Sequence, residues 1–207
     1  MEVQHPLFAR VWTRIALWED KSGGADNRRE LLAGLEGRVI ELGAGSGSNF
    51  EHYPQSVAEV VAVEPEPYLR GKAEEAAARA PVAIRVVEGD ADRLPAEQAS
   101  FDAGVVSLVL CSVPDQDAAL AELHRVIKPG GELRFYEHVL SNRRGRRRFQ
   151  RVMDATVWPR VAGGCHMSRD TRGAIDHAGF RVERSRRFPF PPGRFGLPHI
   201  LGSARRS

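Results

Sequence analysis

The segment Gly-Arg-Val-Ile-Glu-Leu-Gly-Ala-Gly-Ser-Gly, residues 37–47, decides the fold of this 207-residue chain. A short apolar run passes through Glu41 into a turn with glycine at every second position, Gly43, Gly45 and Gly47. Glycine allows a sharp turn and lets backbone N–H groups approach a ligand closely, where a Cβ would obstruct. The pattern is typical of a β-strand followed by a nucleotide-binding turn.

The spacing of these glycines separates two classes of nucleotide-binding turn. The dinucleotide fingerprint Gly-x-Gly-x-x-Gly would require a third glycine at position 48, where this chain has Ser48. A nicotinamide-dependent oxidoreductase is therefore disfavoured. The spacing from Glu41 through Gly43 and Gly45 to Gly47 instead resembles the cofactor loop of class I S-adenosylmethionine-dependent methyltransferases. The resemblance implies S-adenosyl-L-methionine as cofactor and S-adenosyl-L-homocysteine as product.

Two later strand ends carry acidic residues that fit the same interpretation. The apolar run 59–63 leads to Glu64, where an acidic side chain of a doubly wound sheet accepts hydrogen bonds from ribose hydroxyls. The run 83–88 leads to Gly89 and Asp90, and the resemblance implies that Asp90 lies near the adenine amino group. In full, it implies a cofactor site of Glu41, Gly43, Ala44, Gly45, Gly47, Asn49, Glu64, Pro65, Gly89, Asp90, Ala91, Ser107 and Leu108.

The rest of the chain alternates strand and helix patterns, which predicts an α/β protein with parallel strands and right-handed crossovers. We expect the Rossmann-like class I methyltransferase fold: a mostly parallel seven-stranded sheet with helices on both faces and a C-terminal antiparallel hairpin. The expected strands lie near 37–42, 59–64, 83–88, 102–107, 132–138, 180–188 and 198–204, with helices between the first five. We expect one domain, 1–207, made of a helical cap (1–35), a cofactor-binding half (36–140) and an acceptor-side half (141–207).

Helix boundaries are predicted from periodicity and from glycine and proline positions. Residues 4–20 form an amphipathic pattern whose Phe8 and Trp12 pack as core or line the pocket, and Gly23-Gly24 is expected to end this helix. Further helices are predicted at about 27–35, 67–80, 116–127 and 169–178, with Pro129-Gly130-Gly131 as the stop after the fourth helix.

Composition excludes some classes of protein. The formal charge of +3 is small, and most of the excess lies in the basic run 143–151, which we interpret as a solvated helix face, with an anionic-lipid or nucleic-acid contact as the alternatives. No apolar run approaches the ~20 residues of a membrane helix, and no signal peptide is visible. Cys111 and Cys165 are expected to be reduced thiols of a cytoplasmic protein.

Three segments indicate which group of these methyltransferases the chain resembles: Leu108–Val113, Arg125–Glu132 and Tyr136–Val139. They look like the methyltransferase-like 7 group of alkyl thiol methyltransferases and its bacterial relatives. Further matches are Asn49-Phe50, Tyr53-Pro54, Gly164-Cys165, Ser168–Thr171 and Pro198–Ile200. The resemblance implies a small lipophilic acceptor, with a thiol favoured and an amine or hydroxyl as alternatives. Animal members carry an apolar N-terminal anchor that the pattern at 4–20 does not match, so their location is not carried over.

Methyl transfer from a sulfonium requires an oriented nucleophile with a free lone pair, and a thiol needs only mild help to ionise. His138 is the candidate catalytic group, with a structural histidine as the equal alternative. Cys165 and His166 are expected in a loop over the acceptor pocket, and no metal site is expected because the histidines and cysteines show no ligand spacing.

Two rival functions remain at this point. A nucleic-acid methyltransferase is disfavoured because Cys111-Ser112-Val113-Pro114 stands where an Asn-Pro-Pro-Tyr-like motif would follow the fourth strand. A regulator that binds S-adenosylmethionine without turnover is the other. The sequence leaves the oligomeric state open.

Overall fold

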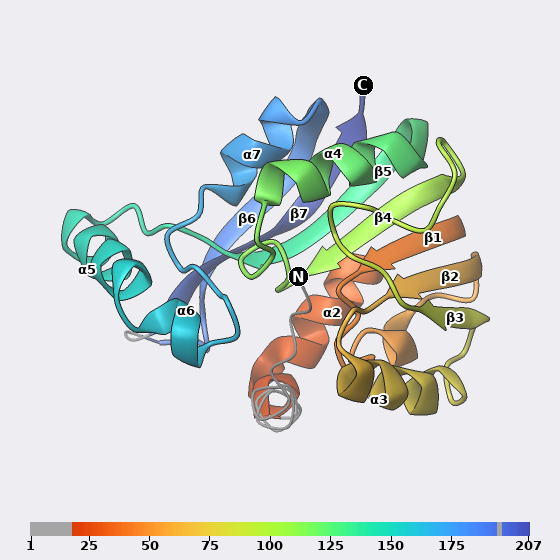
Figure 1. Ribbon diagram of the computed structural model, residues 1–207, viewed down its shortest axis with the longest axis horizontal. Coiled ribbons are helices and arrows are strands. Elements are labelled where there is room, and N and C mark those ends of the chain that lie inside the picture. The colour runs from red at the N-terminus through yellow and green to blue at the C-terminus, as the bar shows by residue number, and fades with distance from the viewer. Residues whose placement is uncertain (1–17, 194–195) are drawn as a thin grey trace.

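The computed structural model describes residues 18–193 and 196–207. Its centre is a seven-stranded sheet in the order β3-β2-β1-β4-β5-β7-β6 (Figure 1). The neighbours from β3 to β5 are parallel, whereas β7 runs antiparallel to both β5 and β6. The expected fold class is confirmed. The strands are β1 (Gly37–Leu42), β2 (Val57–Val63), β3 (Ile84–Val87), β4 (Phe101–Ser107), β5 (Ile127–His138), β6 (Phe180–Phe190) and β7 (Leu197–Arg206).

Helices cover both faces of this sheet because side chains alternate along each strand. On β1, Val39 belongs to one buried cluster and Ile40 to the other. The helices α4 and α7 pack over the face that includes Ile40, and α2 and α3 pack over the face that includes Val39 (Figure 1). The helical elements are η1 (Asp20–Gly24), α2 (Ala25–Leu32), η2 (Phe50–His52), α3 (Pro67–Ala77), α4 (Gln116–Val126), α5 (Arg144–Ala155), α6 (Trp158–Val161) and α7 (Thr171–His177).

Local chemistry sets the ends of these helices. The Asp115 carboxylate accepts the N–H groups of Asp117 and Ala118 and so caps α4. At the other end, the segment Pro129–Gly131 was expected to follow the helix as a stop, but it lies within β5, which begins at Ile127. The register between β4 and β5 shifts in this region, so the proline and glycines form an irregular start of the strand.

The expected break at Gly23-Gly24 is a kink instead of a helix end. Gly23 has a φ of +104°, but Gly24 is helical and leads directly into α2. A Cβ on Gly24 would lie 2.8 Å from the carbonyl oxygen of Glu19, so the two turns approach too closely for a larger residue. Most of the predicted helix 4–20, with Phe8 and Trp12, lies outside the described residues.

Two of the expected crossover helices are absent from the described residues. The connection from β1 to β2 contains only the short 3₁₀ turn η2, and the connection from β3 to β4 is a loop with a single bridge between Asp90 and Arg93. Among residues 18–193 and 196–207, no helix combines the length and the apolar character needed to cross a bilayer.

Candidate active site

The glycine turn follows β1, and its backbone N–H groups donate hydrogen bonds to other residues of the protein. The N–H groups of Gly43 and Ala44 donate to the carbonyl of Val63 at 2.9 and 3.1 Å, and Gly47 donates to the carbonyl of Ala44. The Gly45 N–H donates to the Glu64 carboxylate at 2.8 Å. These four N–H groups therefore have protein partners, and the turn is fixed against β2.

Glycine is required in this turn for conformation and for space. Gly43, Gly45 and Gly47 have φ values of +68°, +57° and +82°, a region that L side chains rarely adopt. A Cβ on Gly43 would lie 2.2 Å from Cγ2 of Val109, in the loop after β4. The turn after β1 thus packs directly on the loop after β4.

Glu64 connects the end of β2 to the glycine turn. The side chain is buried, and its two oxygens accept the N–H groups of Gly45 at 2.8 Å and Glu66 at 3.0 Å. Burial raises the pKa of this carboxyl group, against the effect of these two hydrogen bonds. Pro65, next to it, is exposed.

Glu41 lies beneath the turn as part of a buried support. Its carboxylate accepts hydrogen bonds from Nδ2 of Asn49 at 2.8 Å and from the hydroxyl of Tyr53 at 2.7 Å. Burial raises the pKa of Glu41 to about 7. Both carboxylate oxygens of Glu41, and Nδ2 of Asn49, therefore already have hydrogen-bond partners within the protein.

Arg28 on α2 is a functional candidate that the sequence did not reveal. Its guanidinium is buried and donates to Asn49 Oδ1 at 3.0 Å and to Ser107 Oγ at 3.1 Å, and thereby joins the turn after β1 to the end of β4. Two carboxylates balance its charge, Glu19 at 3.2 Å and Asp20 at 2.9 Å. No local pattern marks Arg28, because its partners come from distant segments.

The remaining predicted cofactor residues lie at neighbouring strand ends. Asp90 is exposed after β3, and a Cβ on Gly89 would lie 2.8 Å from Cδ of Pro95. Ala91 packs partly buried against the core. After β4, Leu108 has a φ of +58° and its N–H donates to the carbonyl of Tyr136 at 2.7 Å. The carboxyl ends of β3, β2, β1 and β4 adjoin in the sheet, so these loops share one edge.

The same edge continues to a cluster of Cys111, His138 and Cys165. Sγ of Cys165 lies 3.5 Å from Nδ1 of His138, and the potential ligand atoms of the three residues all lie within 4.8 Å of one another. Both thiols are buried and neither forms a disulfide. The sequence predicted His138 as catalytic but gave no sign of this grouping, because His138 ends β5 and the two cysteines come from two different loops.

Glu137 fixes one side of this cluster. Its fully buried carboxylate accepts the N–H groups of Val109 and Leu110, each at 2.9 Å, and of Cys111 at 3.3 Å. The carbonyl of Cys111 in turn accepts the His166 N–H at 2.7 Å. The loop after β4 is therefore held by β5 on one side and by the loop before α7 on the other.

The environment of the cluster favours a thiolate at Cys165. A hydrogen bond with Cys111 is the main cause that lowers the pKa of Cys165, with His138 contributing in the same direction against burial. The same contact and burial raise the pKa of Cys111. For His138, burial lowers the pKa, but the contact with Cys165 outweighs it and the net shift is upward. The cluster can therefore hold a negative sulfur beside a positive imidazole.

Aromatic rings line the side of His138 that faces β7. The ring of His199 lies edge-on at 4.4 Å between centroids, and the rings of Phe188 and Phe190 pack on His199 at 5.9 and 5.6 Å. Burial lowers the pKa of His199 to about 3, so this ring is neutral and apolar in character. The cluster is thus bordered by an aromatic wall.

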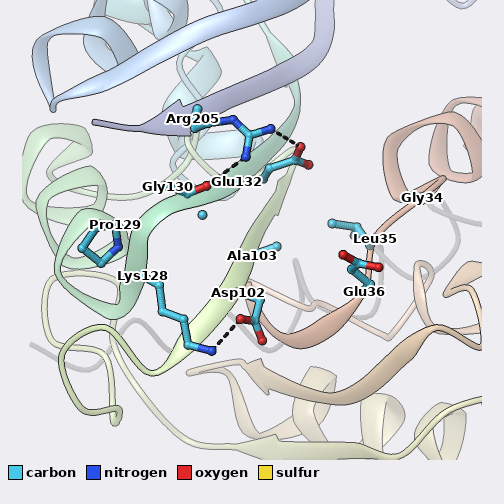
Figure 2. A pocket seen from close by; sticks show the side chains of 11 residues that line it. Gly34, Leu35, Glu36, Asp102, Ala103, Lys128, Pro129, Gly130, Glu132 and Arg205 are labelled. Atoms are coloured by element: carbon cyan, nitrogen blue, oxygen red, sulfur yellow. Dashed lines mark hydrogen bonds and ion pairs between the residues drawn. The ribbon is translucent and has the colours of Figure 1, made fainter.

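A hollow of ≈ 390 Å³ lies at the opposite end of the sheet, away from these loops (Figure 2). Its lining holds two ion pairs, both drawn in Figure 2: Lys128 with Asp102 at 2.5 Å and Arg205 with Glu132 at 2.9 Å. None of the predicted site residues lines it. Its lining is Gly34, Leu35, Glu36, Asp102, Ala103, Lys128, Pro129, Gly130, Gly131, Glu132 and Arg205.

Comparison with known proteins shows the family to which this chain belongs. A family model described as a methyltransferase domain matches residues 40–135. Thiol S-methyltransferase TMT1B of Mus musculus is 38% identical over 206 residues, which cover 96% of this chain and 82% of that protein. Thiol S-methyltransferase TMT1A of Homo sapiens is 30% identical over 193 residues, 87% of this chain and 78% of that protein.

Solved structures agree on the fold. The YcgJ protein of Bacillus subtilis superposes with a TM-score of 0.71 at 16% identity, over 90% of this chain and 98% of that chain. A methyltransferase structure from Bacillus halodurans gives a TM-score of 0.69, also at 16% identity, over 86% of this chain and 96% of that one. At this identity the likeness concerns the fold alone.

Proposed function

Because this chain belongs to the S-adenosylmethionine-dependent methyltransferases, we propose that it methylates a small lipophilic thiol. The observation that carries the proposal is that one sheet edge holds both the glycine turn with Glu64 and the buried cluster of Cys111, His138 and Cys165. The names of the TMT1 relatives, which align over most of their length, support the choice of a thiol.

Glu64 offers the clearest fit to the cofactor. A carboxylate has about four acceptor positions, and in this structure the N–H groups of Gly45 and Glu66 use two of them. The others suit the two hydroxyls of a ribose, as the sequence predicted. S-adenosylmethionine, when bound, supplies an activated sulfonium methyl group. The chain's own task is then to bind and orient the two substrates and to exclude water.

The support for a lipophilic thiol comes from the residues around His138. A thiol of ordinary pKa about 8.5 reacts as its thiolate, which a neighbouring positive charge favours. The pKa of His138 is shifted upward, which favours such a charge, and the aromatic wall of Phe188, Phe190 and His199 provides apolar surface beside it. The sequence suggested His138 as a mild base or as a positive neighbour of the thiolate, and either role activates the acceptor.

A direct assay tests this function. Purified protein is incubated with S-adenosylmethionine and a panel of thiols, phenols and amines, and release of S-adenosylhomocysteine is measured. We expect turnover with lipophilic thiols above that with matched phenols and amines. Turnover on RNA alone would assign the protein to the nucleic-acid rival, and tight S-adenosylhomocysteine binding without turnover on any acceptor would favour the regulator.

We also propose a cytoplasmic protein that contacts anionic membranes through α5. This helix carries Arg144, Arg147, Arg148 and Arg151 around a shallow surface with Val152. It also exposes Phe149 by 58% and Val152 by 54%. A basic helix that exposes apolar side chains binds in the interface of an anionic bilayer, whereas a simply solvated helix gains nothing from them.

Vesicle co-sedimentation tests the membrane contact. We expect binding to vesicles of phosphatidylserine and phosphatidylcholine but not of phosphatidylcholine alone. Phe149→Ser should weaken it, and Tyr68→Ser, a change of an exposed aromatic on α3, should not. Equal binding by both variants, or none by the original protein, would refute the contact.

A further inference from the structure

We propose that Cys111, His138 and Cys165 bind a zinc ion with an open fourth position that accepts the sulfur of the thiol substrate. Two cysteines and one histidine form a ligand set found in catalytic zinc sites, which keep one position for water or substrate. The potential ligand atoms of these three residues lie within 4.8 Å of one another. No other group of this kind occurs among the described residues.

The distances within the cluster match a tetrahedral zinc site. Zinc–sulfur bonds of about 2.3 Å and zinc–nitrogen bonds of about 2.05 Å at tetrahedral angles separate a sulfur ligand from a nitrogen ligand by roughly 3.5 Å. The observed separation between Sγ of Cys165 and Nδ1 of His138 is 3.5 Å. The potential ligand atom of Cys111 lies within 4.8 Å of those of the other two residues.

The surroundings of the ligands are built like those of a metal site. Glu137 fixes the backbone of Cys111 through its N–H. On the other side, the Asp154 carboxylate accepts the N–H groups of Met167 and Ser168 at 2.9 and 2.8 Å, which anchors the loop of Cys165 to α5. Outer contacts that hold ligands in place are characteristic of metal sites and contribute to affinity.

The burial of the ligands points in the same direction. A zinc ligand must be a thiolate, and both Cys111 and Cys165 are buried free thiols. A buried thiolate is costly unless it is paired, and two sulfurs with an imidazole form a donor set that suits zinc.

The role of the open position, unlike the metal site itself, rests on the proposed function. When the acceptor thiol binds zinc through sulfur, its proton passes to solvent and the sulfur becomes a thiolate. That sulfur forms a bond to the sulfonium methyl carbon, and the bond between the methyl group and the sulfonium breaks with its electron pair on the leaving sulfur. The products are the methyl thioether and S-adenosylhomocysteine, and zinc ends the reaction unchanged.

Metal analysis tests the site without relying on activity. The protein is purified with a phosphine reductant, given zinc sulfate, passed over a desalting column, and analysed by elemental mass spectrometry. We expect about one zinc per chain, as for a single site. Cys165→Ser and His138→Asn should each lower the retained zinc at least tenfold. His177→Asn, a change of an exposed histidine on α7, should retain it. Far-ultraviolet circular dichroism shows whether each variant is folded.

Cobalt substitution tests the open position. We expect a thiolate-to-cobalt absorption band with the original protein that is lost in Cys165→Ser. Addition of an alkyl thiol should change the visible cobalt bands, and the matched alcohol should not. Absence of bound zinc and cobalt in the folded original protein would overturn the proposal, as would equal retention by Cys165→Ser and His177→Asn.

The outcomes separate this proposal from the proposed function. Thiol methylation that continues in metal-free protein with chelator present would leave the function intact, overturn the proposed role of the open zinc position and assign acceptor activation to His138. Zinc and thiol binding without methyl transfer to any thiol would support the metal site and refute the function.

Discussion

The two ends of the sheet both carry acidic side chains, but the pKa values of these carboxyl groups shift in opposite directions at the two ends. At the amino end of β4 and β5, hydrogen bonding to Lys128 lowers the pKa of Asp102, so the partly exposed pair is stabilised in its charged form. At the carboxyl end of the same sheet, burial raises the pKa of Glu41 and Glu137 to about 7. The hollow of Figure 2 lies at the first end, and the buried carboxylates with raised pKa values lie at the second.

This difference supports the proposal that the carboxyl end of the sheet holds the active site. A solvent-exposed ion pair contributes little and needs no functional explanation. A buried carboxylate with a raised pKa costs free energy, and such groups cluster at functional sites. The glycine turn, Glu64 and the Cys111 cluster lie at the end with these buried carboxylates. We therefore expect the hollow of Figure 2 to take no part in the reaction.

The largest expected contrast between the two ends concerns glycine. Gly45 and Gly130 both have left-handed φ values, +57° and +75°. Valine at either position introduces comparable backbone strain of about 1–2 kcal/mol. Gly45→Val should abolish binding of S-adenosylhomocysteine in calorimetric titration, since we propose that the cofactor binds beside this turn, whereas Gly130→Val should bind normally. Normal binding by folded Gly45→Val would place the cofactor elsewhere.

The second contrast is in the pH dependence of stability. The pKa of Glu41 is raised from an ordinary 4.5 to about 7 in the folded state. The folded protein then holds a proton that the unfolded chain has lost, so this group's contribution to the free energy of unfolding falls as pH rises from ~4.5 to ~7, by up to ~3 kcal/mol. Glu41→Gln should remove this part of the slope.

Urea unfolding at pH 5 and pH 8 measures the effect of Glu41. The original protein should lose more stability between the two values than Glu41→Gln does. Glu132→Gln, at the amino end of the sheet, serves as the matched control and should follow the original protein. Equal losses in the free energy of unfolding between pH 5 and pH 8 in all three proteins would show that the pKa of Glu41 is not raised in the folded state.

The third contrast compares Glu137, whose carboxylate accepts backbone N–H groups, with Glu132, whose carboxylate pairs with arginines. Glu137→Gln replaces one accepting oxygen with an NH₂ group that cannot accept the N–H groups of the loop Val109–Cys111. We expect a loss of about 2–3 kcal/mol in the free energy of unfolding at pH 8, because buried donors are left without partners. Glu132→Gln should cost at most about 1 kcal/mol, since its contacts to Arg134 and Arg205 are partly exposed. Equal losses would mean that the loop rearranges freely.

The fourth contrast concerns the ribose. Glu64→Ala should weaken S-adenosylhomocysteine binding about 10- to 100-fold, by removal of charge-assisted hydrogen bonds worth roughly 1.5–3 kcal/mol. Asp102→Ala removes a carboxylate from the opposite end and should leave the dissociation constant unchanged. Calorimetry on both variants decides the point, and an unchanged constant for Glu64→Ala would exclude Glu64 as the ribose ligand.

Sequence alone predicted the features that depend on neighbouring residues. Each strand appears as an apolar run, and the topology rule for parallel sheets then brings Gly45 and Glu64 to one edge. Boundaries were less exact: the segment Pro129–Gly131 lies within β5, at the register shift between β4 and β5, and does not separate helix from strand.

Features that depend on distant partners could not be predicted. Arg28 joins Asn49 to Ser107 only after α2 has packed beside the sheet. Cys111 and Cys165 meet at His138 because two loops close over the end of β5, and no spacing in the chain marks them as a set. The glycine turn was predicted in position but not in detail, since its N–H groups mostly bond to β2.

The smallest expected effect is that of Lys128→Ala, which tests directly whether a substrate binds in the hollow of Figure 2. Lys128→Ala removes one member of the exposed pair with Asp102, which should cost at most about 1 kcal/mol of stability because such pairs are screened by solvent. Turnover on the best thiol and the affinity for S-adenosylhomocysteine should both stay within twofold of the original protein. A large loss of turnover in folded Lys128→Ala would mean that a substrate uses the hollow, and the assignment of chemistry to the carboxyl end alone would then be wrong.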